Sequence, residues 1–456
     1  MMTNNLPPGP PPARNIFQVM RLMGQLNQDS LGTFAEWSRA YGDIFAIKIM
    51  NMQQWVVTHP EHIHQILVTD ADKFIKDAGY KDERRGLARF LGNGLLNSDG
   101  EFWKRQRRLV APALHTRRIE AYAETMVDYT VKMLDTWQDA TQVDISHEMS
   151  GLTMQIVAKT LFNADVSEDI DTVYKTMAVI QKASGDMTVL PEWVPTPIKF
   201  KSRQAVSDLD RIVYGLIRER RASGDDKGDL LSMLLLAQDD EGNGMSDKQA
   251  RDEAVTLFLA GHETTANSLN WTWYQLAQHP EVEAKLHAEL DSVLGGRPPT
   301  LDDLKHLPYT EMVMKESMRL YPPAWSFSRE AVVDVPLGDY VIPKGTVVAI
   351  INYLTHRDPR WWDQPEAFLP ERFSPEHEKD VRKYAYVPFG GGPRICIGNS
   401  FAMMEARLLL ATIASRYRLT LQPGQKVETQ PLITLNPKNG LPMTLYAREP
   451  VREVIA

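Results

Sequence analysis

The sequence predicts a mainly α-helical fold with small β-sheets, in a single domain that covers residues 1–456. Good helix formers recur at spacings of three and four residues from position 101 to about position 320. Short runs rich in β-branched and aromatic residues fall in two separate zones, near 43–58 and 331–351. No internal repeat and no low-complexity linker divides the chain, so one large domain fits better than two or three.

The first two thirds of the chain give these elements in order. Residues 6–12, LPPGPPP, form an extended lead-in, because proline lacks an amide donor and restricts the residue before it. Helices are expected at 31–40 and 60–68, on either side of the strand-like runs IFAIKI and WVVT. The long helical part is broken where Gly or Pro cluster, at 190–197, 223–228, 239–244 and 295–299.

The last third is expected to be less regular. The zone 331–351 predicts short strands, with turns at Gly338 and 343–345. Residues 355–395 look irregular, and a last helix is expected at 397–414. A hairpin is expected around 437–440.

Composition excludes several classes of protein. The chain carries 51 Lys and Arg against 59 Asp and Glu, a formal net charge of −8, so nothing attracts it as a whole to nucleic acid. The single cysteine excludes an intrachain disulfide and four-thiolate zinc or iron–sulfur sites. No run approaches the roughly 20 apolar residues of a membrane span, and no signal peptide is recognisable. We therefore expect a cytoplasmic protein with no membrane anchor and no nucleic-acid partner.

The segment 389–398, FGGGPRICIG, carries the strongest chemical signal. Its three consecutive glycines allow backbone conformations closed to other residues and a close approach to a ligand. Cys396 stands where the last helix begins, so the helix dipole and free amides favour a thiolate. Gly398 leaves space beside the sulfur, and Arg394 can pair with an acidic group. The loop can therefore hold a deprotonated sulfur against a flat metal cofactor, whereas a lone cysteine without this pattern is more often an inert buried thiol.

A second signal, AGHETT at 260–265, lies inside a long helical stretch. Ala260 and Gly261 remove bulk from one turn, which leaves room over a cofactor. Glu263 and Thr264 place an acid beside a hydroxyl, and such a pair can relay protons directly or through water. Taken alone, the segment also fits a helix with tolerated small residues and a surface glutamate.

An E-x-x-R spacing predicts a charged pair on one helix face. Glu316 and Arg319 are three residues apart and can therefore contact each other. The segment PERF at 370–373 offers Arg372 as a third member of a buried cluster, in which arginine forks satisfy the carboxylate. The alternative is a solvated ion pair of little energetic value.

A W-x-x-x-R spacing places Trp103 and Arg107 on one side of a helix. Together with Arg329 and Arg394, these residues can clamp two carboxylates. The alternative is that Trp103 belongs to the core and Arg107 is solvated.

In this order, the four patterns resemble the cytochrome P-450 family. FGGGPRICIG resembles the family's F-x-x-G-x-R-x-C-x-G haem loop, and AGHETT resembles its oxygen-activating helix segment. E-S-M-R and PERF resemble the K-helix motif and its partner, and WKRQR resembles the C-helix motif. The resemblance covers nearly the whole chain, as far as PLITLNPKNGLPM near its end. It implies the family's triangular, helix-rich fold, with a long central helix over haem.

The resemblance also implies roles for individual residues. Cys396 would be the iron ligand, and Glu263 and Thr264 would deliver protons. Glu316, Arg319 and Arg372 would be structural. The haem contacts that it implies are Trp103, Arg107, Ala260, Gly261, Thr264, Arg329, Pro388, Phe389, Arg394, Cys396 and Gly398. Members that attach haem covalently carry a glutamate where this chain has Ala260, so haem b is expected to bind without a covalent link.

The activity implied is O2-dependent monooxygenation of a lipophilic small molecule, such as a fatty acid or terpenoid, by hydroxylation or epoxidation. LPPGPPP, AGHETT, PERF and PEWVPTP resemble the microsomal and fatty-acid-hydroxylating branches, yet no apolar anchor precedes the prolines, which favours a soluble bacterial-type member. The walls of the substrate pocket are expected near 70–98, 165–225, 324–328 and 432–436.

Electrons are expected from a separate protein, because the chain has no G-x-G-x-x-G and no G-x-x-x-x-G-K segment. A ferredoxin or flavodoxin with an NAD(P)H reductase fits this need. Two alternatives stay open. One is a peroxide-driven peroxygenase of the same fold, against which the Glu263–Thr264 pair argues, and the other is a haem sensor or carrier without turnover.

Overall fold

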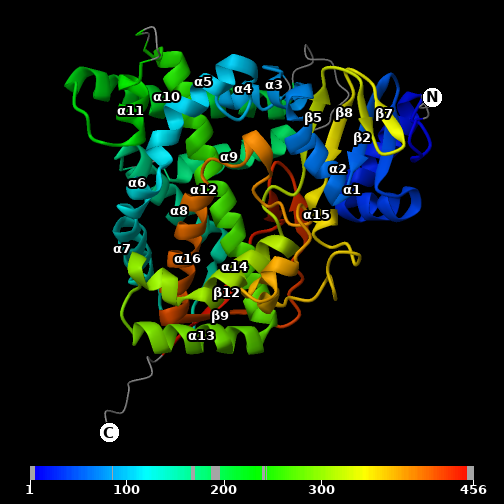
Figure 1. Ribbon diagram of the computed structural model, residues 1–456. Coiled ribbons are helices and arrows are strands. Elements are labelled where there is room, and N and C mark those ends of the chain that lie inside the picture. Colours follow the sequence, from blue (N-terminus) through cyan, green and yellow to red (C-terminus); the bar gives the residue numbers. More distant parts are fainter. Residues whose placement is uncertain are drawn as a thin grey trace.

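The computed structural model describes residues 6–84, 86–165, 170–185, 196–238, 242 and 244–448. Within these ranges the chain is mainly helical and has four small sheets (Figure 1). Most helices gather on one side, and the largest sheet lies on the other, beside α1 (Ile16–Tyr41). The prediction of a mainly α fold with small sheets is confirmed.

The longest helix, α12 (Asp247–Gln278), runs through the middle of the helical part (Figure 1). It begins at the cap residue Ser246, whose side chain accepts a hydrogen bond from the amide of Gln249. Most of its side chains are buried because other helices pack around it, among them α8 (Ile145–Phe162), α10 (Pro197–Ser223), α14 (Pro308–Leu320) and α16 (Asn399–Arg416).

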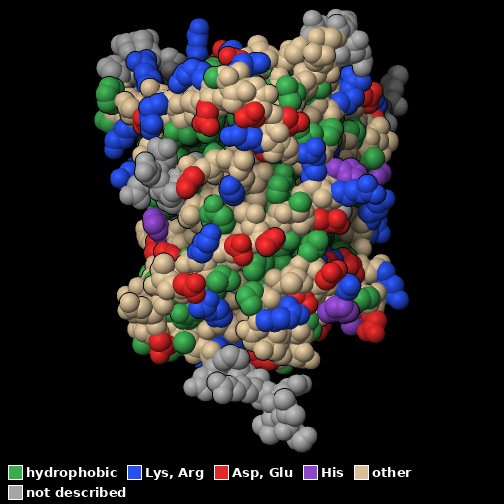
Figure 2. Space-filling model, turned by 90° about the vertical axis from the view of Figure 1, so that its left-hand side faces the viewer, with side chains coloured by type: hydrophobic (Ala, Val, Ile, Leu, Met, Phe, Trp, Pro, Cys, Tyr) green, Lys and Arg blue, Asp and Glu red, His purple; other side chains and the backbone are tan. Residues whose placement is uncertain are grey.

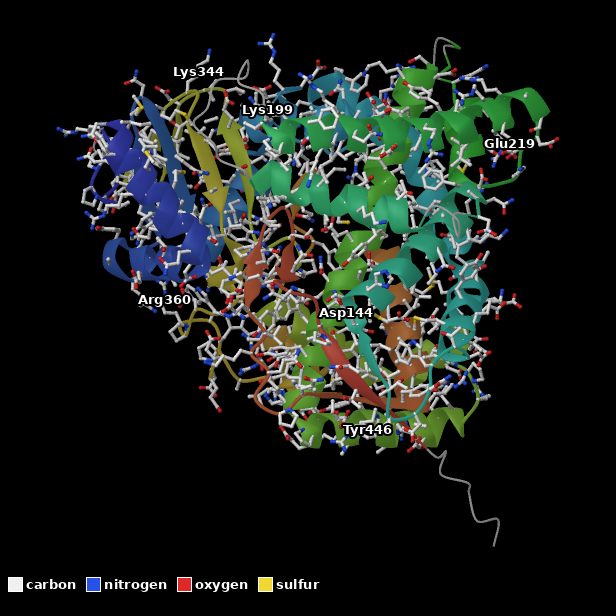
Figure 3. All side chains as sticks on the ribbon, turned by 180° about the vertical axis from the view of Figure 1, so that it is seen from behind. Asp144, Lys199, Glu219, Lys344, Arg360 and Tyr446 are labelled. Atoms are coloured by element: carbon white, nitrogen blue, oxygen red, sulfur yellow. The ribbon has the colours of Figure 1, made fainter. Side chains whose placement is uncertain are left out.

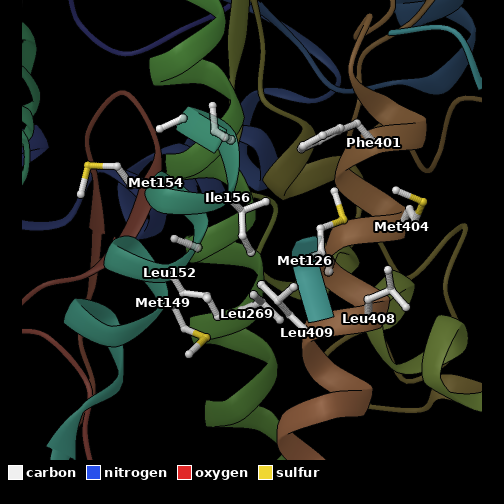
Figure 4. Packing of buried hydrophobic residues seen from close by; sticks show 14 of the residues in the cluster. Met126, Met149, Leu152, Met154, Ile156, Leu269, Phe401, Met404, Leu408 and Leu409 are labelled. Atoms are coloured by element: carbon white, nitrogen blue, oxygen red, sulfur yellow. The ribbon is translucent and has the colours of Figure 1, made fainter. Parts of the chain in front are cut away.

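Apolar side chains from α8, α12 and α16 form the centre of the core. Leu152, Leu269 and Leu409, one from each helix, come together there and are at most 3% exposed (Figure 4). Truncating one such leucine to alanine typically costs about 2–5 kcal/mol. This packing fixes α12 against α16, and so it fixes AGHETT relative to the loop from which α16 starts.

The largest sheet draws its strands from distant parts of the sequence. Its strands stand in the order β1 (Ile44–Ile49), β2 (Met52–Val57), β8 (Val347–Ile350), β5 (Phe327–Ala331) and β3 (Phe74–Ile75). The two predicted β zones therefore meet in one sheet, where β2 runs parallel to β8. In β5, Arg329 pairs with Val348 and is buried.

The other elements are shorter. The remaining helices include α2 (Pro60–His64), the π-helix η1 (Gln65–Thr69), α3 (Ala78–Lys81), α4 (Ala88–Leu91), α5 (Gly100–Val110), α6 (Thr116–Glu120), α7 (Ala123–Leu134), α9 (Ile170–Gly185), α11 (Leu230–Leu236), α13 (Pro280–Leu294) and α15 (Asn352–Thr355). The small sheets contain β4 (Gln142–Asp144) with β12 (Pro442–Ala447) and β9 (Tyr417–Leu421), β6 (Val335–Leu337) with β7 (Tyr340–Ile342), and β10 (Thr429–Pro431) with β11 (Leu435–Pro437).

Two details differ from the sequence expectations. Helix α1 begins at Ile16, well before the expected start at 31, and it is kinked at Asp29. The hairpin expected around 437–440 is wrong, because β11 pairs with β10 whereas β12 pairs with β9 and β4. The turn at 437–440 therefore leads from one sheet to another, and the hairpin closes over 431–435 instead. The expected break at 190–197 lies mostly outside the described residues.

Asp144 joins the start of α8 to the last sheet. Its Oδ1 atom accepts from the amide of Ser146 at 3.0 Å and from the amide of Leu441 at 2.8 Å, so it caps the helix and holds the residue before β12 (Figure 3).

On the face that carries α6, α7, α10 and α11, acidic and basic side chains are interspersed (Figure 2). Among the described residues, no helix combines the length and apolar character needed to cross a membrane.

Candidate functional site

Cys396 lies in a loop that packs closely against η1. The amide of Cys396 donates to the carbonyl of Phe389 at 3.0 Å, which closes the loop. Gly392 has φ +65°, and a side-chain carbon there would lie 1.8 Å from the carbonyl oxygen of Leu67, so only glycine fits. At Gly398 such a carbon would lie 4.0 Å from the Cys396 sulfur, so glycine keeps that flank of the sulfur free.

Solvent reaches Cys396 even though protein atoms surround it. Burial raises the pKa of the Cys396 thiol, and the amide of Gly398 and the Arg107 guanidinium oppose this rise. The predicted benefit from the helix terminus is therefore smaller than the cost of burial. A coordinating metal cation deprotonates a thiol outright, and this loop supplies the open sulfur that such a cation needs.

Ala260 is exposed in the middle of α12, between residues that are otherwise largely buried. Space that solvent enters therefore reaches the centre of the core helix at this point. The Thr264 hydroxyl faces the same turn, because it donates to the carbonyl of Ala260 at 2.8 Å. Gly261 also contributes to helix packing. A side-chain carbon there would lie 3.2 Å from Val157 of α8, so this glycine permits close helix packing.

Glu263 and Thr264 do not hydrogen-bond to each other. The carboxylate of Glu263 accepts from the hydroxyl of Thr434 at 2.7 Å, whereas the Thr264 hydroxyl donates along its own helix. Burial raises the pKa of Glu263 to about 7, and the Thr434 hydroxyl limits this rise. Glu263 is thus a partly buried acid whose raised pKa lies near neutral pH, and it directly precedes Thr264 in the sequence.

Three of the expected clamp residues meet beside the cysteine loop. The Arg394 guanidinium lies 4.3 Å from the ring centre of Trp103. Arg107, one helical turn after Trp103 on α5, donates to the carbonyl of Ile395 at 3.1 Å. Arg394 also donates to Ser98 O at 2.9 Å and pairs with the carboxylate of Asp99.

Arg329 reaches this cluster from β5, and the sequence reasoning missed a fourth cation, Lys76. Both side chains are buried, at 7% and 6% exposure, and burial lowers the pKa of each. Arg329 and Arg394 further lower the pKa of Lys76, so the positive charges are close enough to repel one another. Asp99, with the buried Asp77, compensates only part of this charge. The Asp99 carboxylate already accepts from Lys76 N, Lys81 Nζ and Arg394.

The Glu316–Arg319 pair is fully buried, which confirms the buried alternative over the solvated one. Arg319 Nε and one terminal nitrogen donate to the two oxygens of Glu316 at 2.7 and 2.8 Å. Arg372 joins them, as its Nε lies 3.3 Å from Glu316.

The other residues that sequence reasoning missed had weak signals. Asp99 precedes a helix in the sequence SDGE, a typical cap position, but its carboxylate makes no cap bond because it binds the cations instead. Lys76 and Thr434 stand in segments without a recognisable motif. Only the fold shows that the first lies beside Arg329 and the second beside Glu263.

Haem presents a flat ring, an iron and two carboxylates. The site offers an exposed cysteine, an exposed helix position at Ala260, and a cluster of buried and partly buried cations with too few anions. Buried charges require partners. Four cations, Lys76, Lys81, Arg329 and Arg394, stand against two anions, Asp77 and Asp99, and this excess fits the two carboxylates. The residues present therefore fit this group.

Comparisons with known proteins agree with this arrangement. The family model described as "Cytochrome P450" matches residues 7–442. Cyclooctatin synthase of Streptomyces melanosporofaciens is 39% identical over 403 residues, which cover 87% of each protein. Cyclooctat-9-en-7-ol 5-monooxygenase of the same organism is 38% identical over 407 residues, covering 86% of this chain and 88% of the relative. The crystal structure of the cytochrome P450DA heme domain, 26% identical, matches with a TM-score of 0.87 over 98% of this chain and 100% of that one.

Proposed function

Because the chain belongs to the cytochrome P450 family, we propose that it inserts one oxygen atom of O2 into a lipophilic small molecule, by hydroxylation or epoxidation. Membership makes it an enzyme of the monooxygenase class and implies a haem cofactor. The observation that carries the proposal is the pairing of two features. One is a cysteine sulfur open to solvent beside the start of α16, and the other is an open turn in the core helix at Ala260.

Haem b is held without a covalent link in this proposal. Cys396 would provide the iron ligand, and Trp103, Arg107, Arg329 and Arg394 would hold the propionates. Lys76 adds a further cation for the same carboxylates. No carboxylate is available at Ala260 to form an ester with the ring, which favours non-covalent binding.

Thiolate-bound haem supplies the activation of O2 when electrons arrive. The chain's own residues would leave a gap beside the helix and transfer protons into it. Ala260 leaves the gap beside the helix, and Thr264 holds a hydroxyl at its edge. Glu263 holds a proton that it can release near neutral pH, because burial places its pKa at about 7. Rotation of the Thr264 hydroxyl away from Ala260 O would direct its proton into the gap, and Glu263 would replace that proton through water.

A terpenoid is the substrate class that the comparisons favour among the lipophilic candidates. One relative is named for oxidising cyclooctat-9-en-7-ol, a lipophilic compound that already carries one hydroxyl. Apolar side chains dominate the interior near α8, α9 and α12, which suits such a molecule.

A separate ferredoxin or flavodoxin with an NAD(P)H reductase would supply the electrons. The chain would act as one cytoplasmic haem domain over residues 1–456. The peroxide-driven alternative needs no such donor, so product formation with hydrogen peroxide alone would favour it.

The ligation is tested by carbon monoxide binding to the reduced protein. We expect the red-shifted Soret band of thiolate ligation in the parent protein and its loss in Cys396→His. Survival of the band in this variant would show that another residue holds the iron.

The proton role is tested with Thr264→Ala, and Thr264→Ser serves as the matched control. We expect the substrate dissociation constant to stay unchanged in both variants. Product formed per NAD(P)H should fall in Thr264→Ala, with hydrogen peroxide released instead, because acid–base groups contribute about 10²–10⁴-fold. Unchanged coupling in Thr264→Ala would remove this hydroxyl from the reaction and favour the peroxide-driven alternative.

A further inference from the structure

We propose that Thr434 is a positioning residue for Glu263, and that Gln181 fixes Thr434 in turn, so that the protonation of the acid is set from outside its own helix. This inference rests on the role proposed above for Glu263. Thr434 lies between β10 and β11, and Gln181 lies on α9. Both segments belong to the regions expected to form the substrate pocket.

The direction of the Thr434 hydroxyl bond follows from its partners. Its oxygen accepts from the amide nitrogens of Gln181 at 2.9 Å, Asn436 at 3.0 Å and Asn267 at 3.2 Å. A side-chain NH2 group can only donate, and a hydroxyl oxygen has two lone pairs, so these three contacts share and fill its acceptor capacity. Its single hydrogen is left for the carboxylate of Glu263, at 2.7 Å. The network therefore favours the charged form of Glu263.

Gln181 is itself held in one orientation. Its Oε1 accepts from the backbone amide of Ile433 at 3.1 Å, a group that can only donate. Its Nε2 must therefore point to Thr434, as the 2.9 Å contact shows. Both Gln181 and Thr434 are 6% exposed, so water does not replace these bonds readily.

The segment that carries Thr434 is fixed at both ends by indole groups. Trp325 Nε1 donates to the carbonyl of Leu432 at 2.9 Å, and Trp271 Nε1 donates to the carbonyl of Leu435 at 2.8 Å. Trp271 stands on α12, two turns after Glu263. The hydroxyl and the acid are thus placed relative to each other by the same helix.

Charged neighbours do not explain the state of Glu263. Among the described residues, only burial and the Thr434 hydroxyl act on its pKa. On α12, His262 is neutral, because burial lowers its pKa to about 4 and its ring faces the carbonyl of Phe258. From α16, Glu405 lies beside Thr265, and burial raises its pKa to about 8.

The group facing Glu263 from the other elements carries no charge. It is the Thr434 hydroxyl, which Gln181 of α9, Asn436 and, on α12 itself, Asn267 contact through their amides. The neighbouring Lys182 on α9 is exposed. Thr434 is therefore the hydrogen-bond donor that counters the effect of burial on Glu263.

The experiment titrates Glu263 directly in the ferric holoprotein. The infrared band of the protonated carboxyl group is followed against pH, and the Glu263→Gln spectrum identifies it by subtraction. In Thr434→Val we expect the titration midpoint to rise by about 1–2 pH units, the value of one hydrogen bond to a charged group. Thr434→Ser keeps the hydroxyl and should restore the parent midpoint. If Thr434→Val does not fold, Thr434→Cys replaces it, because a thiol is a weak donor and should also raise the midpoint.

An unchanged midpoint in Thr434→Val or Thr434→Cys would overturn the assignment of Thr434. The pH dependence of product formed per NAD(P)H separates this from the wider proposal. If the infrared midpoint rises but coupling does not follow it, Thr434 still positions Glu263, and the role of Glu263 in proton supply is refuted. If both move together and Thr434→Ser restores both, the two proposals stand.

Discussion

Replacing Arg319 by lysine should destabilise the protein although the charge is kept. Arginine has five N–H donors, and the structure uses all of them. Two bind Glu316, and the other three bind the carbonyls of His356, Pro365 and Ala367 at 2.7–3.0 Å. Lysine has three donors, so at least two buried acceptors lose their partner. At about 1–2 kcal/mol each, the loss is about 2–4 kcal/mol. Arg319→Ala leaves the carboxylate unpaired and should cost about 3–5 kcal/mol.

The loss of Arg319 should also weaken haem binding, because Arg319 is connected to the cysteine loop through hydrogen bonds of His356. His356 Nδ1 faces the carbonyl of Arg319 at 3.2 Å, and its Nε2 accepts from the amide of Val387 at 2.9 Å. These partners require a neutral ring with its hydrogen on Nδ1. Burial and the cations of Arg319 and Arg357 lower the pKa of His356 to about 3, so the ring stays neutral. Val387 is two residues before Phe389, whose carbonyl closes the loop around Cys396.

The assay is urea unfolding of purified holoprotein together with haem content per chain. Arg416→Lys is the matched control, because Arg416 forms a surface pair with Asp135 and such pairs contribute about 0–1 kcal/mol. We expect Arg319→Lys to lower both the unfolding midpoint and the haem content, and Arg416→Lys to change neither. If the two variants behave alike and load fully with haem, the buried cluster does not stabilise the cysteine loop.

Three further changes test other parts of the site. Lys76→Met should fold but release haem faster to an apoprotein acceptor, whereas Lys104→Met, an exposed control, should not; equal release rates would exclude Lys76 from the propionate site. Glu405→Gln should stabilise the protein by about 3 kcal/mol at pH 7 and by less than about 1 kcal/mol at pH 5, at about 1.4 kcal/mol per pH unit. Burial raises the pKa of Glu405 from 4.5 to about 8, so the carboxylate destabilises the folded protein increasingly between pH 4.5 and pH 8 and not below pH 4.5. A stabilisation by Glu405→Gln that does not depend on pH would contradict this. Arg108→Glu, on the exposed side of α5, should slow the first electron transfer from an acidic ferredoxin. It should also weaken the dependence of that rate on salt, since the Debye length is about 10 Å at 0.1 M. A rate that does not depend on salt in the parent protein would place the docking site elsewhere.

The sequence predicted those parts of the site whose chemistry is local. The cysteine loop, the E-x-x-R pair and the W-x-x-x-R pair each place their members within one turn or one helix face, so spacing alone brings them together. The buried state of Glu316 was also predictable, because PERF supplied Arg372 as a third member. The start of α1 at Ile16 was missed because the preceding prolines and the Asp29 kink interrupt the periodic pattern.

Two residues that are adjacent in the sequence of a helix do not in general contact the same part of the structure. Successive residues point about 100° apart around the axis, since a helix has 3.6 residues per turn. Ala260 therefore opens to solvent while Gly261 packs on Val157. For the same reason Glu263 turns to Thr434, although Thr264 is next to it in the sequence. Contacts such as Lys76 with Arg329 join segments far apart in sequence, and without the fold no spacing could reveal them.

The two sides of the site depend on different kinds of contact. The cysteine loop is held by the Cys396 amide on the Phe389 carbonyl, by the Val387 amide on the His356 ring, and by the Arg107 side chain on the Ile395 carbonyl. The acid on α12 is held by the side chain of Thr434, which Gln181 contacts in turn. Changes in the 432–436 segment can therefore alter proton supply while the thiolate ligation persists, whereas changes around Arg319 should remove the ligation first.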